Sequence, residues 1–200
     1  MSVVLAVCGN NFFKIMSDGR LVKFENLIPF DAEKFTVANE THPKVIKVAE
    51  HWAAGIAGSG DIAFSLFDEI NKRPAYKKLP LEKILFKIKN KLKTYRTPPI
   101  KTTVFVGGVD SQNQCSLSIL RSDKEYEIEQ IVPRHNEFAI KGVFPSTIDG
   151  ETILENRICN HMPFRDIEHV DLLMRNCIEG VAEINRSVNK VIFEELIVLR

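Results

Sequence analysis

Short apolar runs separated by turn-forming residues dominate the beginning of the chain. Residues 3–8 form a continuous run of β-branched and small apolar side chains, and residues 12–17 form a second such run. A short apolar run bounded by turn signals is typical of a buried strand. The residues between the two runs, Gly9, Asn10 and Asn11, favour a turn. The pattern therefore predicts a β-hairpin with both strands largely buried.

The same kind of pattern continues along the chain and alternates with longer segments of helical periodicity. In residues 81–95, for example, Leu85, Ile88 and Leu92 share one stripe, as expected for an amphipathic helix. Residues 21–41 are expected to hold short strands and loops. Further strands are expected at residues 44–48, 51–57, 102–106, 115–120, 126–132 and 191–199. Helices are expected around residues 62–70, 81–95, 147–161 and 167–184.

The order of these elements predicts the fold class. Helices come in pairs between blocks of mostly antiparallel strands. Two stacked sheets with a helical layer on each side bury both faces of such strands. The chain contains no repeat, low-complexity segment or linker. We therefore expect a single domain over residues 1–200, of the α+β class, built as a four-layer αββα sandwich.

Composition narrows the class of protein further. Of the 200 residues, 44% are hydrophobic and 26% charged, and the net charge is +1, so no global field attracts nucleic acid or membrane. No apolar stretch approaches the ~20 residues of a membrane span. The apolar run near the N-terminus has no basic segment before it and no small-residue cleavage site after it. We expect a cytoplasmic protein with neither a nucleic-acid nor a membrane partner.

The metal-binding residue types show no ligand spacing. The four cysteines form no CxxC pair, and the five histidines are scattered. This distribution favours buried, reduced thiols over a disulfide framework or a zinc site. We expect no metal and no cofactor.

One basic stretch needs a separate interpretation. Lys83, Lys87 and Lys91 follow one another at helical spacing, beside the apolar stripe. A solvated helix face explains them, while binding of nucleic acid or of an acidic partner is the alternative.

Several short motifs follow one another at characteristic distances. Ser2 precedes the first strand, and Asp18-Gly19-Arg20 ends the second. Lys44 opens a later strand, Ala57-Gly58 ends the strand after it, and residues 107–110 read Gly-Gly-Val-Asp. In order and spacing this set resembles the proteasome β-subunit family, which includes the proteolytic subunit of the bacterial ATP-dependent heat-shock protease. Members of that family are N-terminal nucleophile hydrolases with an αββα sandwich, which implies a hydrolase of peptide or amide substrates.

The resemblance assigns a role to each matching residue. Ser2 would be the nucleophile, and its own α-amine, with a reference pKa near 8, would be the base. Lys44, paired with Asp18, would lower the pKa of the amine and hold its geometry. The backbone N–H of Gly58 would stabilise the oxyanion. Without the resemblance, Ser2 is only a residue that permits methionine removal, Asp18 a turn residue, Lys44 a surface lysine and Gly58 part of a helix start.

The sequence also departs from the family pattern. The nucleophile is serine in place of threonine, and Ser146 follows Pro145 where the family has a Ser-Gly pair. Asn185 lies near the position of a family aspartate, and Ser187 does not reproduce the serine that follows it. If Met1 is retained, the amine of Ser2 is tied up in a peptide bond. The alternative to a hydrolase is therefore a catalytically degenerate scaffold or binding subunit of the same fold.

The resemblance also implies partners. Family members assemble into rings, so we expect a homo-oligomer. It further allows an ATPase partner. The sequence itself contains no ring-contact motif that we recognise.

Overall fold

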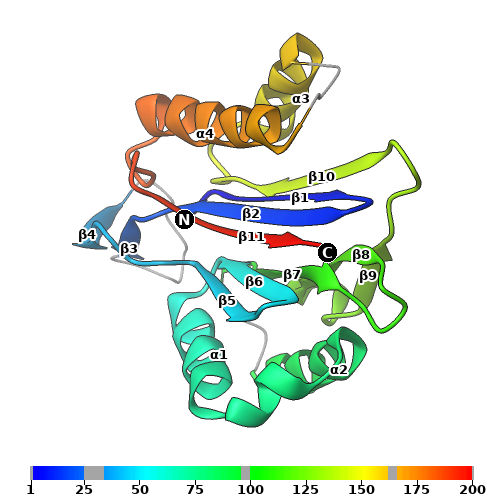
Figure 1. Cartoon of the computed structure of the whole chain (residues 1–200). Coiled ribbons are helices and arrows are strands. Elements are labelled where there is room, and N and C mark those ends of the chain that lie inside the picture. The colour runs from blue at the N-terminus through cyan, green and yellow to red at the C-terminus, as the bar shows by residue number, and fades with distance from the viewer. Residues whose placement is uncertain (1, 25–33, 96–99, 162–165, 200) are drawn as a thin grey trace.

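A computed structural model describes residues 2–24, 34–95, 100–161 and 166–199, with the side chains of residues 159–161 outside the description. Figure 1 shows four layers, in which two antiparallel sheets face each other between two pairs of helices. The helices α3 (Gly150–His161) and α4 (Ile167–Ile184) cover one sheet, and α1 (Gly60–Lys72) and α2 (Leu81–Lys93) cover the other. The predicted αββα sandwich is confirmed.

The first sheet joins the two ends of the chain. Its strand order is β10-β1-β2-β11. The bounds are β1 Val4–Gly9, β2 Phe12–Asp18, β10 Phe138–Val143 and β11 Ile192–Val198. The predicted hairpin is confirmed as β1 and β2, which are buried along their whole length. The sequence pattern missed β10, an edge strand whose residues are only partly buried and which contains Gly142.

The second sheet has five strands in sequence order, β5-β6-β7-β8-β9. The bounds are β5 Val45–Ala49, β6 Trp52–Ala57, β7 Thr103–Val109, β8 Cys115–Arg121 and β9 Ile128–Ile131. The strand predicted from residue 126 begins later, because Glu125 and Tyr126 have φ values of 51° and 56°, which a strand does not accommodate. Gly107, Gly108 and Val109 belong to β7, and the turn after this strand begins at Asp110.

Smaller elements complete the chain. β3 (Leu21–Phe24) and β4 (Phe35–Asn39) form a separate two-stranded sheet. Two 3₁₀ turns, η1 (Pro74–Lys78) and η2 (Ser122–Lys124), follow α1 and β8. Residues 21–41 were predicted to hold short strands and loops, and residues 25–33 of this segment lie outside the described residues. Pro98 and Pro99, which follow α2 in the sequence, lie outside them as well.

The hydrophobic core consists of three clusters, one for each boundary between layers. One cluster lies between α1, α2 and the five-stranded sheet, and a second lies between α3, α4 and the four-stranded sheet. The third lies between the sheets, where glycine lets them approach closely. A Cβ on Gly107 would meet the ring of Phe13 at 2.3 Å, and one on Gly55 would meet Ile15 at 2.5 Å. Large side chains of β2 thus fill space that glycines of the facing sheet leave open.

Candidate active site

The strand topology brings the four predicted site residues to one end of the sandwich. Ser2 lies just before β1 and Asp18 ends β2, which pairs antiparallel with β1. Lys44 lies just before β5, and Gly58 follows β6, the antiparallel neighbour of β5. Ser2, Asp18 and Lys44 are all buried. Burial of three polar residues at one end of the sheets is costly unless each is satisfied by a partner.

Asp18 and Lys44 form a buried ion pair that joins the two sheets. Lys44 Nζ lies 2.7 Å from Asp18 Oδ2, and the exposed fractions of the two side chains are 5% and 0%. Asp18 also accepts two backbone hydrogen bonds, from Val3 N–H to Oδ1 at 2.8 Å and from Arg20 N–H to Oδ2 at 2.9 Å. The carboxylate therefore fixes the first peptide of the β1 segment, directly after Ser2, as well as the lysine.

The pKa of Lys44 is lower than that of an exposed lysine. Burial is the largest effect, and it lowers the pKa of Lys44. The negative charge of Asp18 raises the pKa, and the positive charge of Arg20 lowers it further. The net result is a pKa below the usual value of a lysine. Beyond the ion pair, Nζ has no hydrogen-bond partner among the described residues. The lysine thus retains donor capacity at the end of the sheet where Ser2 lies.

Gly58 occupies a position that only glycine can adopt. Its φ is +115°, and a Cβ there would lie 2.3 Å from the Lys101 carbonyl oxygen and 2.7 Å from Thr102 Cα. The following residue, Ser59, is the N-cap of α1, but its side chain accepts no hydrogen bond from a backbone N–H of the helix. Gly58 therefore places its backbone just ahead of the positive end of the α1 dipole.

A cavity of about 470 Å³ connects Ser2 with Gly58. Both residues line it, and so does Ser146, which the sequence pointed to as a substitute for the Ser-Gly pair of the family. The structure thus brings the nucleophile candidate, the oxyanion-donor candidate and a second hydroxyl to one cavity, while Asp18 and Lys44 support the chain beside it.

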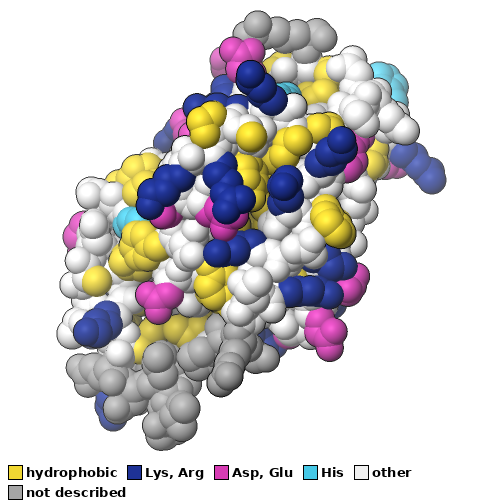
Figure 2. All heavy atoms as spheres, turned by 90° about the horizontal axis from the view of Figure 1, so that it is seen from below, with side chains coloured by type: hydrophobic (Ala, Val, Ile, Leu, Met, Phe, Trp, Pro, Cys, Tyr) yellow, Lys and Arg dark blue, Asp and Glu magenta, His cyan; other side chains and the backbone are white. Residues whose placement is uncertain are grey.

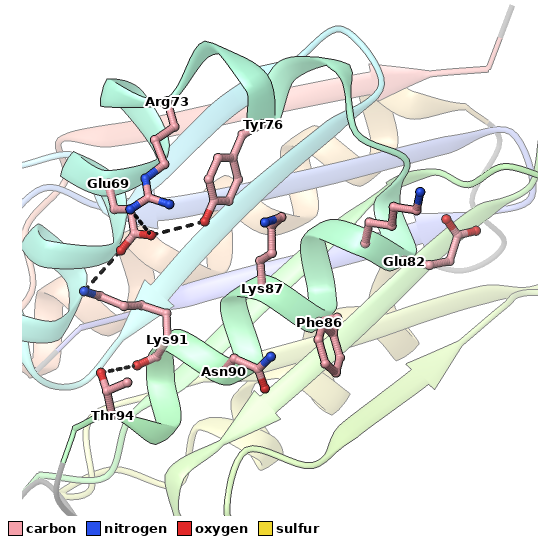
Figure 3. A pocket seen from close by; sticks show the side chains of 10 residues that line it. Glu69, Arg73, Tyr76, Glu82, Phe86, Lys87, Asn90, Lys91 and Thr94 are labelled. Carbon is pink, nitrogen blue, oxygen red and sulfur yellow. Dashed lines mark hydrogen bonds and ion pairs between the residues drawn. The ribbon is translucent and has the colours of Figure 1, made fainter.

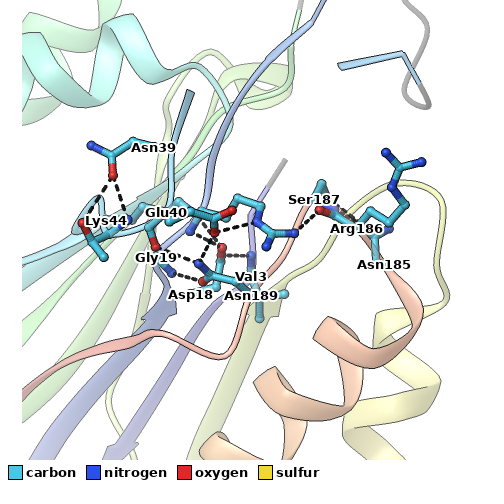
Figure 4. A network of polar contacts seen from close by, with 12 residues as sticks. Val3, Asp18, Gly19, Asn39, Glu40, Lys44, Asn185, Arg186, Ser187 and Asn189 are labelled. Atoms are coloured by element: carbon cyan, nitrogen blue, oxygen red, sulfur yellow. Dashed lines mark hydrogen bonds and ion pairs between the residues drawn. The ribbon is translucent and has the colours of Figure 1, made fainter. Parts of the chain in front are cut away.

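A polar network behind Asp18 includes residues that the sequence did not reveal (Figure 4). Gly19 N–H donates to Asn189 Oδ1 at 3.0 Å, and Asn189 Nδ2 donates to the backbone oxygen and the carboxylate of Glu40 at 2.7 and 2.8 Å. Arg20 Nε donates to the same carboxylate at 2.9 Å. Hydrogen bonds from Arg20 and Asn189 lower the pKa of Glu40.

Comparison with known proteins bears on this arrangement. No protein-family model matches the chain, and no curated protein matches its sequence. The crystal structure of eukaryotic HslV from Trypanosoma brucei superimposes with a TM-score of 0.63, covering 98% of this chain and 99% of the HslV chain. The chain has the fold of HslV. The sequence identity is 14%, so the comparison shows the fold, and it confirms at that level the resemblance to the proteasome-like group.

The end of α4 holds one of the departures from the family pattern described above. Asn185, near the family aspartate, accepts hydrogen bonds from Ser187 N–H and Ser187 Oγ at 2.8 and 2.6 Å. Its Nδ2 donates to Thr147 Oγ1 at 2.8 Å. The carboxamide therefore closes its own turn and ties the end of α4 to the segment before α3.

The outer face of the HslV-like sandwich carries a separate pocket of about 650 Å³ over α1 and α2 (Figures 2 and 3). It contains Lys83, Lys87 and Lys91, the basic face predicted from the sequence, and none of the candidate site residues. Lys91 pairs with Glu69 at 3.1 Å, and Lys87 lies over the ring of Tyr76. Two members of the basic face thus have partners within the protein.

Other features complete the description of chemically active groups. Cys8, Cys115 and Cys177 are buried free thiols, as expected, while the side chain of the fourth cysteine, Cys159, lies outside the description. Across residues 2–24, 34–95, 100–161 and 166–199, no His, Cys, Asp and Glu side chains group as a metal site would require. Within those same ranges, no helix has the length and apolar character needed to cross a membrane.

Proposed function

We propose that this protein is an N-terminal nucleophile hydrolase that cleaves peptide or amide bonds with Ser2. The observation that carries the proposal is the buried Asp18–Lys44 pair, which is hydrogen-bonded through Asp18 Oδ1 to Val3 N–H, one peptide away from Ser2. Ionisable groups whose pKa is shifted by burial and a charged partner cluster at functional sites, and this pair fixes the peptide that follows Ser2.

The proposed reaction needs removal of Met1, which frees the α-amine of Ser2. The amine, with a reference pKa near 8, takes the proton of Ser2 Oγ as Oγ attacks the carbonyl carbon. The Gly58 N–H stabilises the resulting oxyanion, an effect of about 3 kcal/mol in comparable sites. The protonated amine then gives its proton to the leaving nitrogen, and water hydrolyses the acyl ester on Ser2. Lys44, as a nearby cation, lowers the pKa of the amine.

A catalytically degenerate scaffold is the second candidate, and Asn185 favours it. A carboxamide whose oxygen is committed to Ser187 cannot serve as the charged support that the family aspartate provides.

In either case the HslV fold supports assembly into a homo-oligomer, with an ATPase as a further partner of the assembled form. Light scattering tests the assembly, and the mass of one chain in solution would contradict it.

The hydrolase proposal is tested by covalent labelling of protein whose loss of Met1 has been verified by intact mass. We expect a β-lactone probe to add once, on Ser2, and Ser2→Thr to keep the labelling because it keeps the hydroxyl. Ser2→Ala abolishes it. Ser17→Ala is the matched control, since Ser17 is a buried serine on the neighbouring strand. Processed protein that takes no probe and cleaves no amide would establish the scaffold instead.

A further inference from the structure

The pocket on the outer face of α1 and α2 is electropositive. Its volume is about 650 Å³, and four cations and two carboxylates line it, which leaves a net charge of +2. The whole chain carries only +1, so this charge is concentrated on one face of the molecule. Figure 2 views that face, and Lys and Arg side chains gather across it with hydrophobic side chains between them.

Both carboxylates of this pocket already have partners. Glu69 lies 3.1 Å from Lys91 Nζ and 3.5 Å from Arg73 Nη2 (Figure 3). Glu82 accepts hydrogen bonds from Ser111 N–H and Ser111 Oγ at 3.2 and 2.8 Å. The Glu69 carboxylate is therefore occupied by two cations of the pocket, and the Glu82 carboxylate by a serine outside it.

The other two cations of the pocket lack a counter-charge. Among the described residues, neither Lys83 nor Lys87 forms an ion pair. Lys87 Nζ lies 5.9 Å from the centre of the Tyr76 ring, a contact that does not neutralise its charge. Lys83, Lys87 and Lys91 follow one another four residues apart on α2, and like charges at this spacing destabilise a helix. An anion bound between the two unpaired lysines would relieve this repulsion.

An exposed aromatic ring and an amide lie beside these lysines. Phe86 is 62% exposed, and Asn90, one turn further along α2, is exposed as well; both line the pocket. Figure 3 shows the two side chains projecting next to each other. Residues four apart are neighbours on a helix surface and advance about 6 Å along its axis. Phe86 and Asn90 therefore form one row, and Lys83 and Lys87 form a parallel row beside it.

A row of cations beside an aromatic ring matches the two parts of a nucleic-acid strand. Two lysines along one row can neutralise consecutive phosphates of a strand, while a base stacks on the ring. The Asn90 amide has both donors and an acceptor for the edge of a base. An acidic peptide would use the lysines but would leave the flat face of Phe86 without a partner, and a free nucleotide would bring its phosphate to one end of the row.

We propose that Lys83, Phe86, Lys87 and Asn90 on α2 form a binding site for single-stranded nucleic acid, with two phosphates on the lysines and one base on Phe86. The inference is independent of the proposed hydrolase, because the pocket contains none of the residues of the Ser2 site. It takes up the alternative interpretation of the basic face, since the charge is local and the net charge of the chain does not reveal it. Contact with two phosphates predicts binding that weakens as salt rises and depends little on base sequence.

The test measures binding of a fluorescein-labelled oligouridine to the full chain by fluorescence anisotropy at several salt concentrations. We expect Lys83→Gln/Lys87→Gln to reduce the slope of log affinity against log salt by about 0.7 for each lysine. Phe86→Ala should weaken binding about tenfold at every salt concentration and leave the slope unchanged, because it removes stacking and no charge. Lys23→Gln/Lys47→Gln is the matched control, since both lysines are exposed and lie outside the pocket.

Competing ligands test the identity of the occupant. A glutamate oligomer that binds as tightly as the oligouridine would overturn the proposal in favour of an acidic peptide. Uridine monophosphate that binds as tightly as the oligomer would overturn it in favour of a free nucleotide. An unchanged salt slope in Lys83→Gln/Lys87→Gln would show that the strand binds elsewhere. Labelling of Ser2 by the β-lactone probe, measured on the same variants, reports on the hydrolase separately.

Discussion

Two buried lysines, Lys14 and Lys44, show how differently this fold treats the same charge. The exposed fractions of their side chains are 7% and 5%. Lys14, on β2, contacts the carboxylates of Asp171 and Glu194, and Arg175 pairs with both of these carboxylates at 2.7 Å. Two cations and two anions thus join the first sheet to α4 in a balanced network.

Lys44 has one carboxylate partner, and its pKa lies below the usual value because burial outweighs the attraction of Asp18. A network in which every charge is met by two opposite charges is a structural connection, since nothing is left to bind a further group. A single pair with unused donors is a place where a reacting group can be held. By this difference, Lys44 is the buried lysine that could hold a reacting group, and Lys14 is the one that contributes to stability.

The largest effect is expected at the single pair. Asp18→Asn leaves the Lys44 charge buried without a counter-charge, so we expect the free energy of unfolding to fall by about 3–5 kcal/mol. Urea denaturation at pH 7 measures it. The double variant Asp18→Asn/Lys44→Met should recover part of this loss, because no buried charge remains. Lys47→Met, an exposed lysine of β5, is the control and should change little. A double variant no more stable than Asp18→Asn would contradict the paired-charge account.

A smaller effect is expected in the network. Lys14→Met leaves Arg175 to neutralise Asp171 and Glu194, which are both partly exposed. We expect a loss of about 1–3 kcal/mol in the free energy of unfolding and no change in labelling of Ser2 by the β-lactone probe. Loss of labelling in a folded Lys14→Met protein would contradict the distinction, because it would show that Lys14 also supports the Ser2 site.

The smallest effect is a pH dependence of the Lys14 contribution. Burial raises the pKa of Asp171, but Lys14 and Arg175 outweigh it, so the pKa in the folded protein lies below 3.8. A lowered carboxyl pKa stabilises the fold above the unfolded-state value and loses this effect as pH falls through the folded-state value. The stability difference between wild type and Lys14→Met should therefore shrink below about pH 4. Urea titrations at pH 6, 4 and 3 check this, and a constant difference would be contrary evidence.

Most of the layer architecture could be predicted because the strands and helices carry strong local patterns. The stripe of Leu85, Ile88 and Leu92 gave α2, and the two apolar runs gave the β1–β2 hairpin. β10 was missed because an edge strand that is partly buried on both faces has no clear alternation. The late start of β9 depends on the positive φ values of Glu125 and Tyr126. No sequence pattern signals a positive φ at residues other than glycine.

Some residues of the candidate site could be predicted from the sequence, and others could not. The resemblance to the proteasome β-subunit family pointed to Asp18 and Lys44, and the structure places their charged atoms 2.7 Å apart. Their catalytic roles, like those of Ser2 and Gly58, stay predictions. Asn189 could not have been found, because its bonds to Gly19 and Glu40 join residues 170 and 149 positions apart and a single asparagine carries no local motif.

The strand order also decides when, during synthesis, the candidate site can first be complete. β1 and β2 emerge from the ribosome early, but their outer neighbours in the sheet are residues 138–143 and 192–198. At ordinary translation rates, β11 follows β2 after a delay on the order of ten seconds. Asn189, which anchors Gly19, emerges just before β11. A nascent chain therefore displays its first hairpin long before the strands that flank this hairpin in the sheet are available to enclose it.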